Sequence, residues 1–192
     1  MPLVLASSSP YRRRLLERLR LPFECEAPAL DETPRENETA TALALRLAME
    51  KADVVARRHP DAVVIGSDQV PCLGEQLLSK PGTPDKAFTQ LLACSGRQVV
   101  FHTGLSVQAP GAEPLTSVIP YTVHFRQLAP AEIERYLTLD EPFDCAGSFK
   151  WESLGIALFE RLEGDDPTAL EGLPLIALCD LLRQVGYDPL ST

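Results

Sequence analysis

The chain has 192 residues, of which 45% are hydrophobic, and its 18 basic and 27 acidic residues give a net charge of −9. A chain of this length can bury about 70% of its unfolded surface, which predicts one compact domain or two closely packed lobes. The acidic balance argues against nucleic-acid and anionic-membrane partners, which attract basic surfaces, and no apolar run reaches the roughly 20 residues of a membrane span.

Strands and helices alternate in the first part of the chain. Apolar periodicity and cap residues predict, in order, a strand over 2–6, a helix over 10–20, a loop over 27–39, a helix over 39–58 and a strand over 62–67. Ser9 is the expected N-cap of the first helix, and Pro10 is its expected first residue. The loop is polar and interrupted by prolines, whereas the last strand is a β-branched run that is typical of a buried position.

The second part of the chain contains two long segments of alternating apolar residues. The predicted elements are a helix over 84–94, strands over 97–108 and 115–126, a helix over 130–137, a glycine-bearing loop over 144–155, a strand near 156–160 and a helix over 174–185. The two long strands flank a short turn and are expected to pair antiparallel. The chain is therefore predicted to be an α/β protein with a mixed sheet, in a single domain over 1–192 without a sharp boundary between lobes.

The first helix begins with consecutive arginines, Arg12 to Arg14, beside the positive end of its own dipole, where each cation is unfavourable by a few tenths to about 1 kcal/mol. Residues 1–20 hold five arginines and one acidic residue, a net charge of +4 within a chain of net charge −9. The preceding serines and the free N–H groups of the helix could bind an anion, and the guanidinium groups would complete a phosphate cradle. The alternative is a solvated basic face paired with acidic neighbours.

Lys51 and Asp68 are charged residues in an apolar context. Lys51 lies on the apolar stripe of the helix over 39–58, with its ammonium either reaching solvent at the edge of the stripe or directed into a cleft. Asp68 follows Gly66-Ser67 at the expected end of the buried strand, where α/β sheets place ligand crevices. A capping or turn aspartate is the alternative for Asp68.

Glu32 and Lys80 could complete a site for a phosphate and a metal ion. Glu32 is a candidate second carboxylate beside Asp68, and carboxylates without histidine or cysteine partners suit Mg²⁺ or Mn²⁺. Lys80 precedes Pro81-Gly82, which present it rigidly as a cation, although either residue alone could be an ordinary loop residue. Together these groups fit a polyphosphate with a divalent metal, but the P-loop and dinucleotide-binding motifs are absent from the sequence.

Short segments spread along the chain resemble the Maf family of nucleotide pyrophosphatases. In order they are LASSSPYRRRLL, LDET, LALRLAMEKA, GSDQV, SKPGT and CAGSF, followed near the end by GLPLIALCDLLR. The resemblance implies a cytoplasmic, metal-dependent hydrolase that cuts a nucleoside triphosphate into the monophosphate and pyrophosphate. It also implies an elongated mixed sheet with flanking helices, which form two lobes around a central cleft as in the inosine-triphosphate pyrophosphatases.

The position of each polar residue in these motifs implies its role. Asp68 matches the proton acceptor of the family. The resemblance further implies phosphate binding by Ser7, Arg12 and Arg13, catalytic assistance from Lys51 and Lys80, and a metal ion, Mg²⁺ or Mn²⁺, held by Glu32 and Asp68.

The residue after Asp68 separates branches of the family. Branches that act on dTTP and UTP have threonine there, whereas this chain has Gln69, and its segments FECEAP, SFKWE and FERLEG resemble the branch that hydrolyses 7-methyl-GTP. Tyr11, Gln69 and Glu152 occupy the positions that the resemblance assigns to base selection. N7-methylation makes guanine cationic, so Tyr11 could stack on it and Glu152 could supply the countercharge. Tyr11 replaces the tryptophan that is frequent in this branch, which would weaken the stacking.

Other functions are compatible with the same residues. One is a pyrophosphatase for dTTP and UTP or for inosine and xanthosine nucleotides, and Gln69 argues against the pyrimidine substrates. Another is a regulator that senses a nucleotide without turnover. Lys51 and Asp68 favour turnover, because sensing requires no base.

The expected setting is cytoplasmic, with a nucleotide as the small-molecule partner. The five cysteines are odd in number, widely spaced and without a C-x-x-C motif, which is typical of reduced thiols in a cytosolic protein. A homodimer is expected from the family alone, since nothing in the sequence maps an interface.

Overall fold

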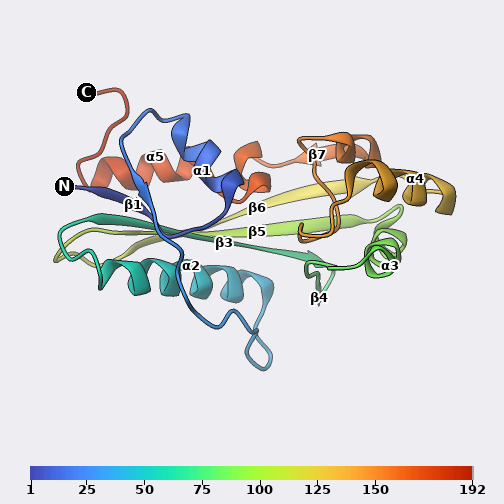
Figure 1. Cartoon of the computed structure of the whole chain (residues 1–192), viewed down its shortest axis with the longest axis horizontal. Helices are drawn as coiled ribbons and strands as arrows, with labels where there is room; N and C mark the ends of the chain where they lie inside the picture. Colours follow the sequence, from blue (N-terminus) through green and yellow to red (C-terminus); the bar gives the residue numbers. More distant parts are fainter. Residues whose placement is uncertain (192) are drawn as a thin grey trace. The chain divides into compact units, whose positions relative to one another are not determined.

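Within residues 1–191, which the computed structural model describes, seven strands form one mixed sheet (Figure 1). Its order is β2-β1-β3-β5-β6-β7, with β4 paired to β3. The strands are β1 (Leu3–Leu5), β2 (Glu24–Cys25), β3 (Val63–Leu73), β4 (Gln76–Leu77), β5 (Gln98–Gln108), β6 (Leu115–Phe125) and β7 (Phe159–Glu163). β1 is parallel to β2 and β3, whereas β4 is antiparallel to β3 and β7 to β6. Residues 109–114 are too short a connection for a parallel crossover, so β5 and β6 pair antiparallel as predicted.

The helices lie where the periodicity predicts them. They are α1 (Pro10–Glu17), α2 (Ala40–Ala56), α3 (Pro84–Cys94), α4 (Pro130–Asp140) and α5 (Leu175–Gln184), with 3₁₀ helices η1 (Leu154–Leu158) and η2 (Pro167–Glu171). Ser9 caps α1 by accepting a hydrogen bond from the N–H of Arg12, and Thr83 caps α3 in the same way. The predicted mixed α/β class is therefore confirmed. In the described part of the chain, no helix combines the length and apolar character needed to cross a membrane.

The described residues form two compact units. The first comprises Met1–Gln69, His102–Pro120 and the segment from Asp166 onward, and the second comprises Val70–Phe101 and Tyr121–Asp165. Most of the boundaries fall inside or at the edges of β3, β5 and β6, where no change of composition marks them, so the sequence alone indicates no sharp boundary. The central cleft that the family resemblance implies stays a prediction.

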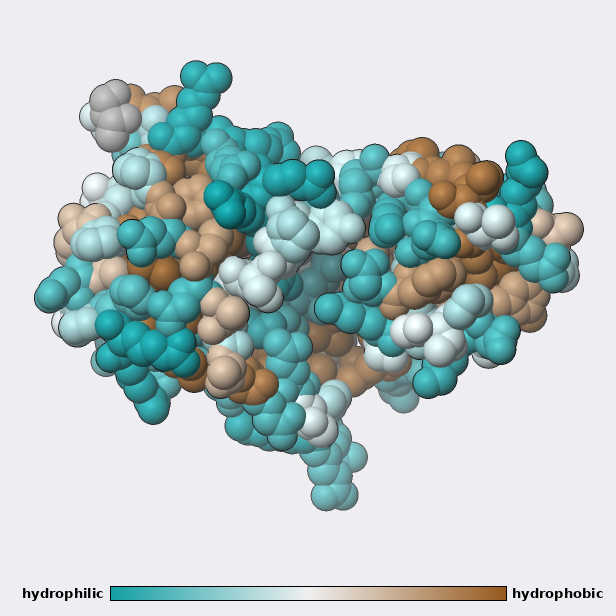
Figure 2. Space-filling model, viewed as in Figure 1, coloured by the Kyte–Doolittle hydropathy of each residue, from teal (hydrophilic) through white to brown (hydrophobic). Residues whose placement is uncertain are grey.

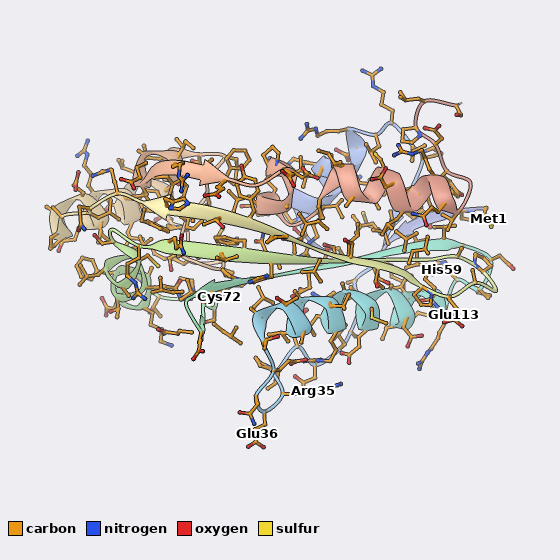
Figure 3. The ribbon with its side chains drawn as sticks, turned by 180° about the vertical axis from the view of Figure 1, so that it is seen from behind. Met1, Arg35, Glu36, His59, Cys72 and Glu113 are labelled. Carbon is orange, nitrogen blue, oxygen red and sulfur yellow. The ribbon has the colours of Figure 1, made fainter. Side chains whose placement is uncertain are left out.

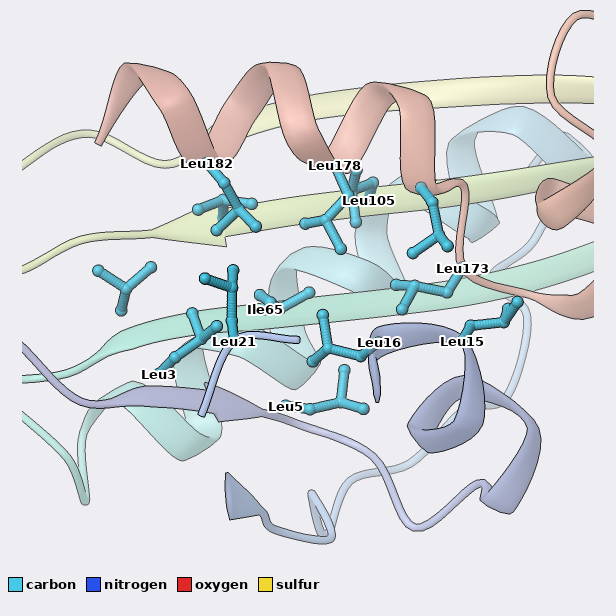
Figure 4. Packing of buried hydrophobic residues seen from close by; sticks show 13 residues of the cluster. Leu3, Leu5, Leu15, Leu16, Leu21, Ile65, Leu105, Leu173, Leu178 and Leu182 are labelled. Carbon is cyan, nitrogen blue, oxygen red and sulfur yellow. The ribbon is translucent and has the colours of Figure 1, made fainter. Parts of the chain in front are cut away.

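Core residues of the first unit lie on both faces of its part of the sheet, because side chains alternate along β1 and β3. Figure 1 shows α1 and α5 on one face and α2 on the other. The cluster on the α1 and α5 face (Figure 4) comprises Leu3, Leu5, Leu15, Leu16, Leu21, Val63, Ile65, Leu105, Val107, Leu173, Leu175, Leu178 and Leu182. The cluster on the α2 face comprises Val4, Ala6, Ala52, Val55, Ala62 and Val64.

Gly66 and Gly104 allow the backbone of α2 to lie directly on the sheet. A Cβ atom at Gly66 would lie 2.1 Å from the carbonyl oxygen of Ala48, and one at Gly104 would lie 2.1 Å from that of Ala44. The predicted end of the strand at 67 is therefore wrong, because Gly66 serves helix packing and β3 continues to Leu73. Asp68 lies inside β3 and not beyond its carboxyl end.

The second unit packs phenylalanine rings edge to face. Phe149 lies 5.4 Å from Phe101, 5.7 Å from Phe125 and 4.8 Å from Phe159, measured between ring centroids. Such pairs contribute about 0.5–1.5 kcal/mol beyond the area that they bury. The prediction of a strand near 156–160 is wrong in its first part, because residues 154–158 form η1 and the strand begins at Phe159.

Helix ends also differ from the prediction, by the most residues at the ends of α1 and α4. α1 ends at Glu17 and not at residue 20, since Arg20 has a left-handed φ of 57° that cannot continue a helix. α4 continues past residue 137 to Asp140 and ends where Glu141 adopts a φ of 44°.

Candidate active site

Polar residues of the first unit gather where β3 extends past the end of β1. Leu5, the last residue of β1, pairs with Ile65. Just after β1, the N–H of Ala6 donates to the carbonyl oxygen of Ile65 at 2.8 Å, and the chain then turns into α1. The turn is ordered by its serines: the buried Ser7 accepts a hydrogen bond on Oγ from the N–H of Ser9 at 3.1 Å.

Lys51 of α2 contacts both candidate carboxylates. Its side chain is only 6% exposed, and its Nζ lies 2.6 Å from Oδ1 of Asp68 and 2.8 Å from Oε1 of Glu32. The ammonium therefore points inward to negative charge and not to solvent. An interruption of the apolar stripe of α2 thus marks the point where α2 meets β3 and the loop that carries Glu32.

Arg12 is a second, partly buried cation beside Asp68. Its Nε donates to the carbonyl oxygen of Gly172 at 2.9 Å, and its Nη2 lies 3.9 Å from Oδ1 of Asp68. Burial lowers the pKa of the Arg12 guanidinium, and the charges of Asp68 and Glu32 oppose that shift. The charges of Lys51 and Arg12 balance those of the two carboxylates, so this cluster has no excess of positive charge for an incoming polyphosphate.

The other predicted residues of the N-terminal segment differ in environment. Arg13 has 64% of its side chain exposed and pairs with Glu17 at 3.1 Å, which is the solvated arrangement given above as the alternative to a phosphate cradle. Tyr11 is half-buried, and the guanidinium of Arg14 lies 5.1 Å from the centre of its ring. The role of Arg13 in phosphate binding and that of Tyr11 in base selection stay predictions.

Lys80 and Glu152 belong to the second unit and are both exposed. The loop that carries Glu152 is anchored on α4: the N–H of Lys150 donates to Oη of Tyr136 at 3.0 Å, and Oγ of Ser153 donates to Oδ1 of Asp140 at 2.5 Å. In the same loop, burial raises the pKa of Cys145 to about 12, which disfavours its thiolate form. The structure does not test the roles of Lys80 and Glu152.

The loop that carries Glu32 is fastened to α2 by Arg46, which the sequence did not single out. Arg46 donates from Nε to Oε1 of Glu38 at 2.6 Å, and from Nη2 to the carbonyl oxygen of Thr33 at 3.1 Å. The protruding end of the loop is mostly hydrophilic in Figure 2, and Figure 3 shows Arg35 and Glu36 pointing away from the sheet. An ion pair and a hydrogen bond from Arg46 therefore fix this part of the loop to α2.

We expect the contribution of Glu38 to stability to depend on pH. Hydrogen bonds from Arg46, and from the N–H of Arg35, lower the pKa of Glu38 from 4.5 to about 2. A depressed carboxylate pKa stabilises the fold above the unfolded value and loses that contribution as the pH falls toward the folded value. The free energy of unfolding of wild type should thus exceed that of Glu38→Gln at pH 7, and the difference should shrink as the pH falls from about 5 to about 3.

Urea unfolding of both proteins across this pH range measures the difference. Glu36→Gln is the matched control, because Glu36 lies on the same loop and is exposed. A difference between wild type and Glu38→Gln that stays constant with pH would show that the ion pair with Arg46 does not stabilise the loop.

Polar side chains of β3 hold η2, a contact that sequence reasoning missed. Nε2 of Gln69 donates to the carbonyl oxygens of Ala169 and Leu170 at 2.7 and 3.0 Å. Oγ of Ser67 lies 2.8 Å from the carbonyl oxygen of Gly172, the same oxygen that accepts from Arg12. The only available signal was a polar residue in an apolar strand, and the partners lie about a hundred residues away.

Glu32 and Asp68 are the residues that fit a divalent metal ion. Residues 1–191 contain no group of three or more His, Cys, Asp or Glu side chains arranged to hold a metal. Both carboxylates nevertheless reach a single cationic nitrogen, that of Lys51, so they can face a single cation. Mg²⁺ is commonly held by one or two carboxylates, with water and substrate phosphates completing its shell. The pair therefore fits a metal that binds together with a phosphate substrate.

Comparison with known proteins gives likenesses over nearly the whole chain. The family model described as Maf-like protein matches residues 2–185. A 7-methyl-GTP pyrophosphatase of Thiobacillus denitrificans (strain ATCC 25259 / T1) is 55% identical over 190 residues, which are 98% of this chain and 94% of that protein. A 7-methyl-GTP pyrophosphatase of Nitrosococcus oceani is 55% identical over 189 residues, which are 98% of this chain and 95% of that protein.

Solved structures resemble part of the chain. The Ham1 protein of Staphylococcus aureus aligns with a TM-score of 0.46 and 18% identity, covering 68% of this chain and 73% of that one. A HAM1 protein from Coxiella burnetii aligns with a TM-score of 0.45 and 16% identity, covering 65% of this chain and 73% of that one.

Proposed function

Because the chain belongs to the Maf family, we propose that it hydrolyses 7-methyl-GTP to 7-methyl-GMP and pyrophosphate. The relatives that carry this activity in their names match almost the full length of the chain. The observation that carries the proposal is the contact of Lys51 with both Asp68 and Glu32, beside the partly buried Arg12. Carboxylates and cations in such an arrangement can position a water molecule and a phosphate group.

The reaction requires an acceptor for one proton of water. The water oxygen forms a bond to the α-phosphorus while the bond to the bridging oxygen breaks, so that pyrophosphate leaves. We assign the proton to Asp68. Among the described residues its ion pairs are made by Oδ1, so that Oδ2 is the oxygen we expect to accept the proton. Lys51 orients the carboxylate by its 2.6 Å contact with Oδ1. A positioned base of this kind contributes typically about 10²–10⁴-fold.

Charge neutralisation is the other requirement, because a triphosphate brings several negative charges to a cluster whose own charges cancel. We assign Arg12, Arg13 and the hydroxyl of Ser7 to the phosphates, with Lys80 as a further cation. A divalent cation, Mg²⁺ or Mn²⁺, held by Glu32 and Asp68 would supply the remaining positive charge at the phosphate oxygens. Lys51 is buried and Arg12 is partly buried, so both act in a medium that screens their charges less than water does.

A pyrophosphate-release screen tests the proposal. The substrates are 7-methyl-GTP, GTP, dTTP, UTP, ITP and XTP, each with Mg²⁺, with Mn²⁺ and with a chelator. We expect 7-methyl-GTP to have the highest kcat/KM and the chelator to abolish turnover. Preference for another nucleotide would assign the chain a different substrate. Binding of nucleotide without any release would make it a sensor and contradict the enzymatic proposal.

The preference for 7-methyl-GTP over GTP should depend on Tyr11 and Glu152. Stacking of a cation on an aromatic ring contributes about 0.5–2 kcal/mol and a charge-assisted hydrogen bond about 1.5–3 kcal/mol. Tyr11→Leu or Glu152→Gln should therefore lower the ratio of kcat/KM for the two nucleotides roughly 3- to 100-fold. Tyr11→Trp should preserve or raise the ratio, because the indole is the larger platform.

Glu160→Gln provides the matched control, since Glu160 is exposed on β7 in the same unit as Glu152. A wild-type ratio near one would refute the assignment to the 7-methyl-GTP branch. An unchanged ratio in both Tyr11→Leu and Glu152→Gln would place base selection on other residues.

We further infer a cytoplasmic location and a nucleotide as the partner, without nucleic acid or membrane. The net charge of −9 and the free state of the five cysteines within the described residues support this inference. The homodimer expected from the family is checked by light scattering of the purified chain.

A further inference from the structure

The amide group of Gln69 is held in one orientation by two backbone carbonyl oxygens, which take both hydrogens of Nε2, with the hydroxyl of Thr103 beside them. Its Nε2 donates to the carbonyl oxygens of Ala169 and Leu170, at 2.7 and 3.0 Å, and lies 3.4 Å from Oγ1 of Thr103. Thr103 is fully buried on β5. Because these groups come from η2 and from a neighbouring strand, they surround the nitrogen from two elements of the first unit.

Thr103 holds one of these two carbonyl groups in place and cannot donate to Gln69, because its own hydrogen is already used. Its Oγ1 donates to the carbonyl oxygen of Ala169 at 2.9 Å. A hydroxyl group has a single hydrogen to donate. If the amide of Gln69 were reversed, its oxygen would face three acceptors that have no hydrogen to share. The hydrogen of Thr103 is thus directed to η2, and the nitrogen of Gln69 must face the same way.

This orientation leaves Oε1 of Gln69 as the group that the side chain can offer to a ligand. Among residues 1–191, the hydrogen bonds of the Gln69 side chain are all made by Nε2. Gln69 is half-buried, directly after Asp68 on β3. The side chain therefore presents a hydrogen-bond acceptor, although glutamine in general could present either end.

We propose that Thr103 is a positioning residue for base selection: by holding the carbonyl group of Ala169, it fixes Oε1 of Gln69 to accept from the ring N–H group on the Watson–Crick edge of the base. The inference rests on the assignment of Gln69 to base selection under the proposed function. It names a substrate class: nucleotides whose ring carries an N–H donor on that edge, as in guanine, hypoxanthine and uracil. Adenine has an unprotonated ring nitrogen there and is selected against, because two acceptors would face each other.

Thr103→Val is the test, since valine keeps the β-branched shape and lacks the hydroxyl. Thr103→Ser keeps the hydroxyl and is the matched control. The readout is the ratio of dissociation constants for AMP and GMP, measured by calorimetry. We expect wild type and Thr103→Ser to bind GMP more tightly than AMP. In Thr103→Val the ratio of the AMP to the GMP dissociation constant should fall about tenfold, which is the effect of one hydrogen bond. If valine prevents folding, Thr103→Ala replaces it in the same measurement.

The affinities for AMP and GMP test the role of Thr103 independently of whether the protein hydrolyses a triphosphate. Lack of pyrophosphate release from 7-methyl-GTP would refute the proposed function, while the AMP to GMP ratio would still be measurable. Equal affinity of wild type for AMP and GMP would overturn the inference, and so would a ratio that stays unchanged in Thr103→Val. A parallel loss of affinity for both nucleotides would also overturn it, because Thr103 would then support only the fold.

Discussion

Asp68→Asn should lower kcat by about 10²–10⁴-fold while the protein stays folded and still binds nucleotide. Asparagine has nearly the shape of aspartate, but its amide cannot accept the proton of the attacking water. Lys51 keeps the carboxylate of Glu32 at 2.8 Å in the variant, so no buried ammonium is left without an anion. The measurements are kcat from pyrophosphate release and the dissociation constant of 7-methyl-GMP.

Asp53→Asn is the matched control for this substitution. Asp53 lies on α2, has 45% of its side chain exposed and pairs with Arg57 in the next turn of the helix. Its replacement should leave kcat unchanged. A kcat of Asp68→Asn close to that of wild type would remove Asp68 from the role of base.

Elements with local signals could be predicted from the sequence. Ser9-Pro10 and Thr83-Pro84 mark helix starts through groups that act within one turn, and both starts are observed. The residues next to Gly66 do not show what its role in the fold is. Whether a glycine ends a strand or admits a helix depends on what packs against it, and here the backbone of α2 does so. The length of β3, and with it the position of Asp68, could not be predicted from neighbouring residues.

The same limit applies to the candidate site. Lys51 could be singled out because a charge on an apolar stripe is unusual, and the structure places its ammonium inward. Arg12 and Arg13 could not be separated, since adjacent helical residues differ by a rotation of about 100° and only tertiary contacts decide which one is buried. Arg12 is 14% exposed and Arg13 is 64% exposed. Thr103 gave no signal, because its partner Ala169 is 66 residues away.

Lys51→Met should lower kcat/KM by about 10²–10³-fold, as the loss of one group that stabilises transition-state charge does. The apolar stripe alone suggests that methionine would preserve or raise stability. The contacts reverse this expectation, because the Asp68 side chain is 11% exposed and would keep only Arg12, at 3.9 Å, as a cationic partner. An unsatisfied buried group costs about 1–3 kcal/mol, and we expect the free energy of unfolding to fall by this amount.

A double variant separates the two effects of Lys51. Removing both partners of a buried pair is less costly than removing one. Lys51→Met combined with Asp68→Asn should thus be more stable than Lys51→Met alone, yet inactive. Lys86→Met, the same change at an exposed position of α3, should alter neither stability nor turnover. If Lys51→Met is as stable as wild type and its turnover per folded molecule is unchanged, Lys51 serves neither the carboxylates nor the reaction.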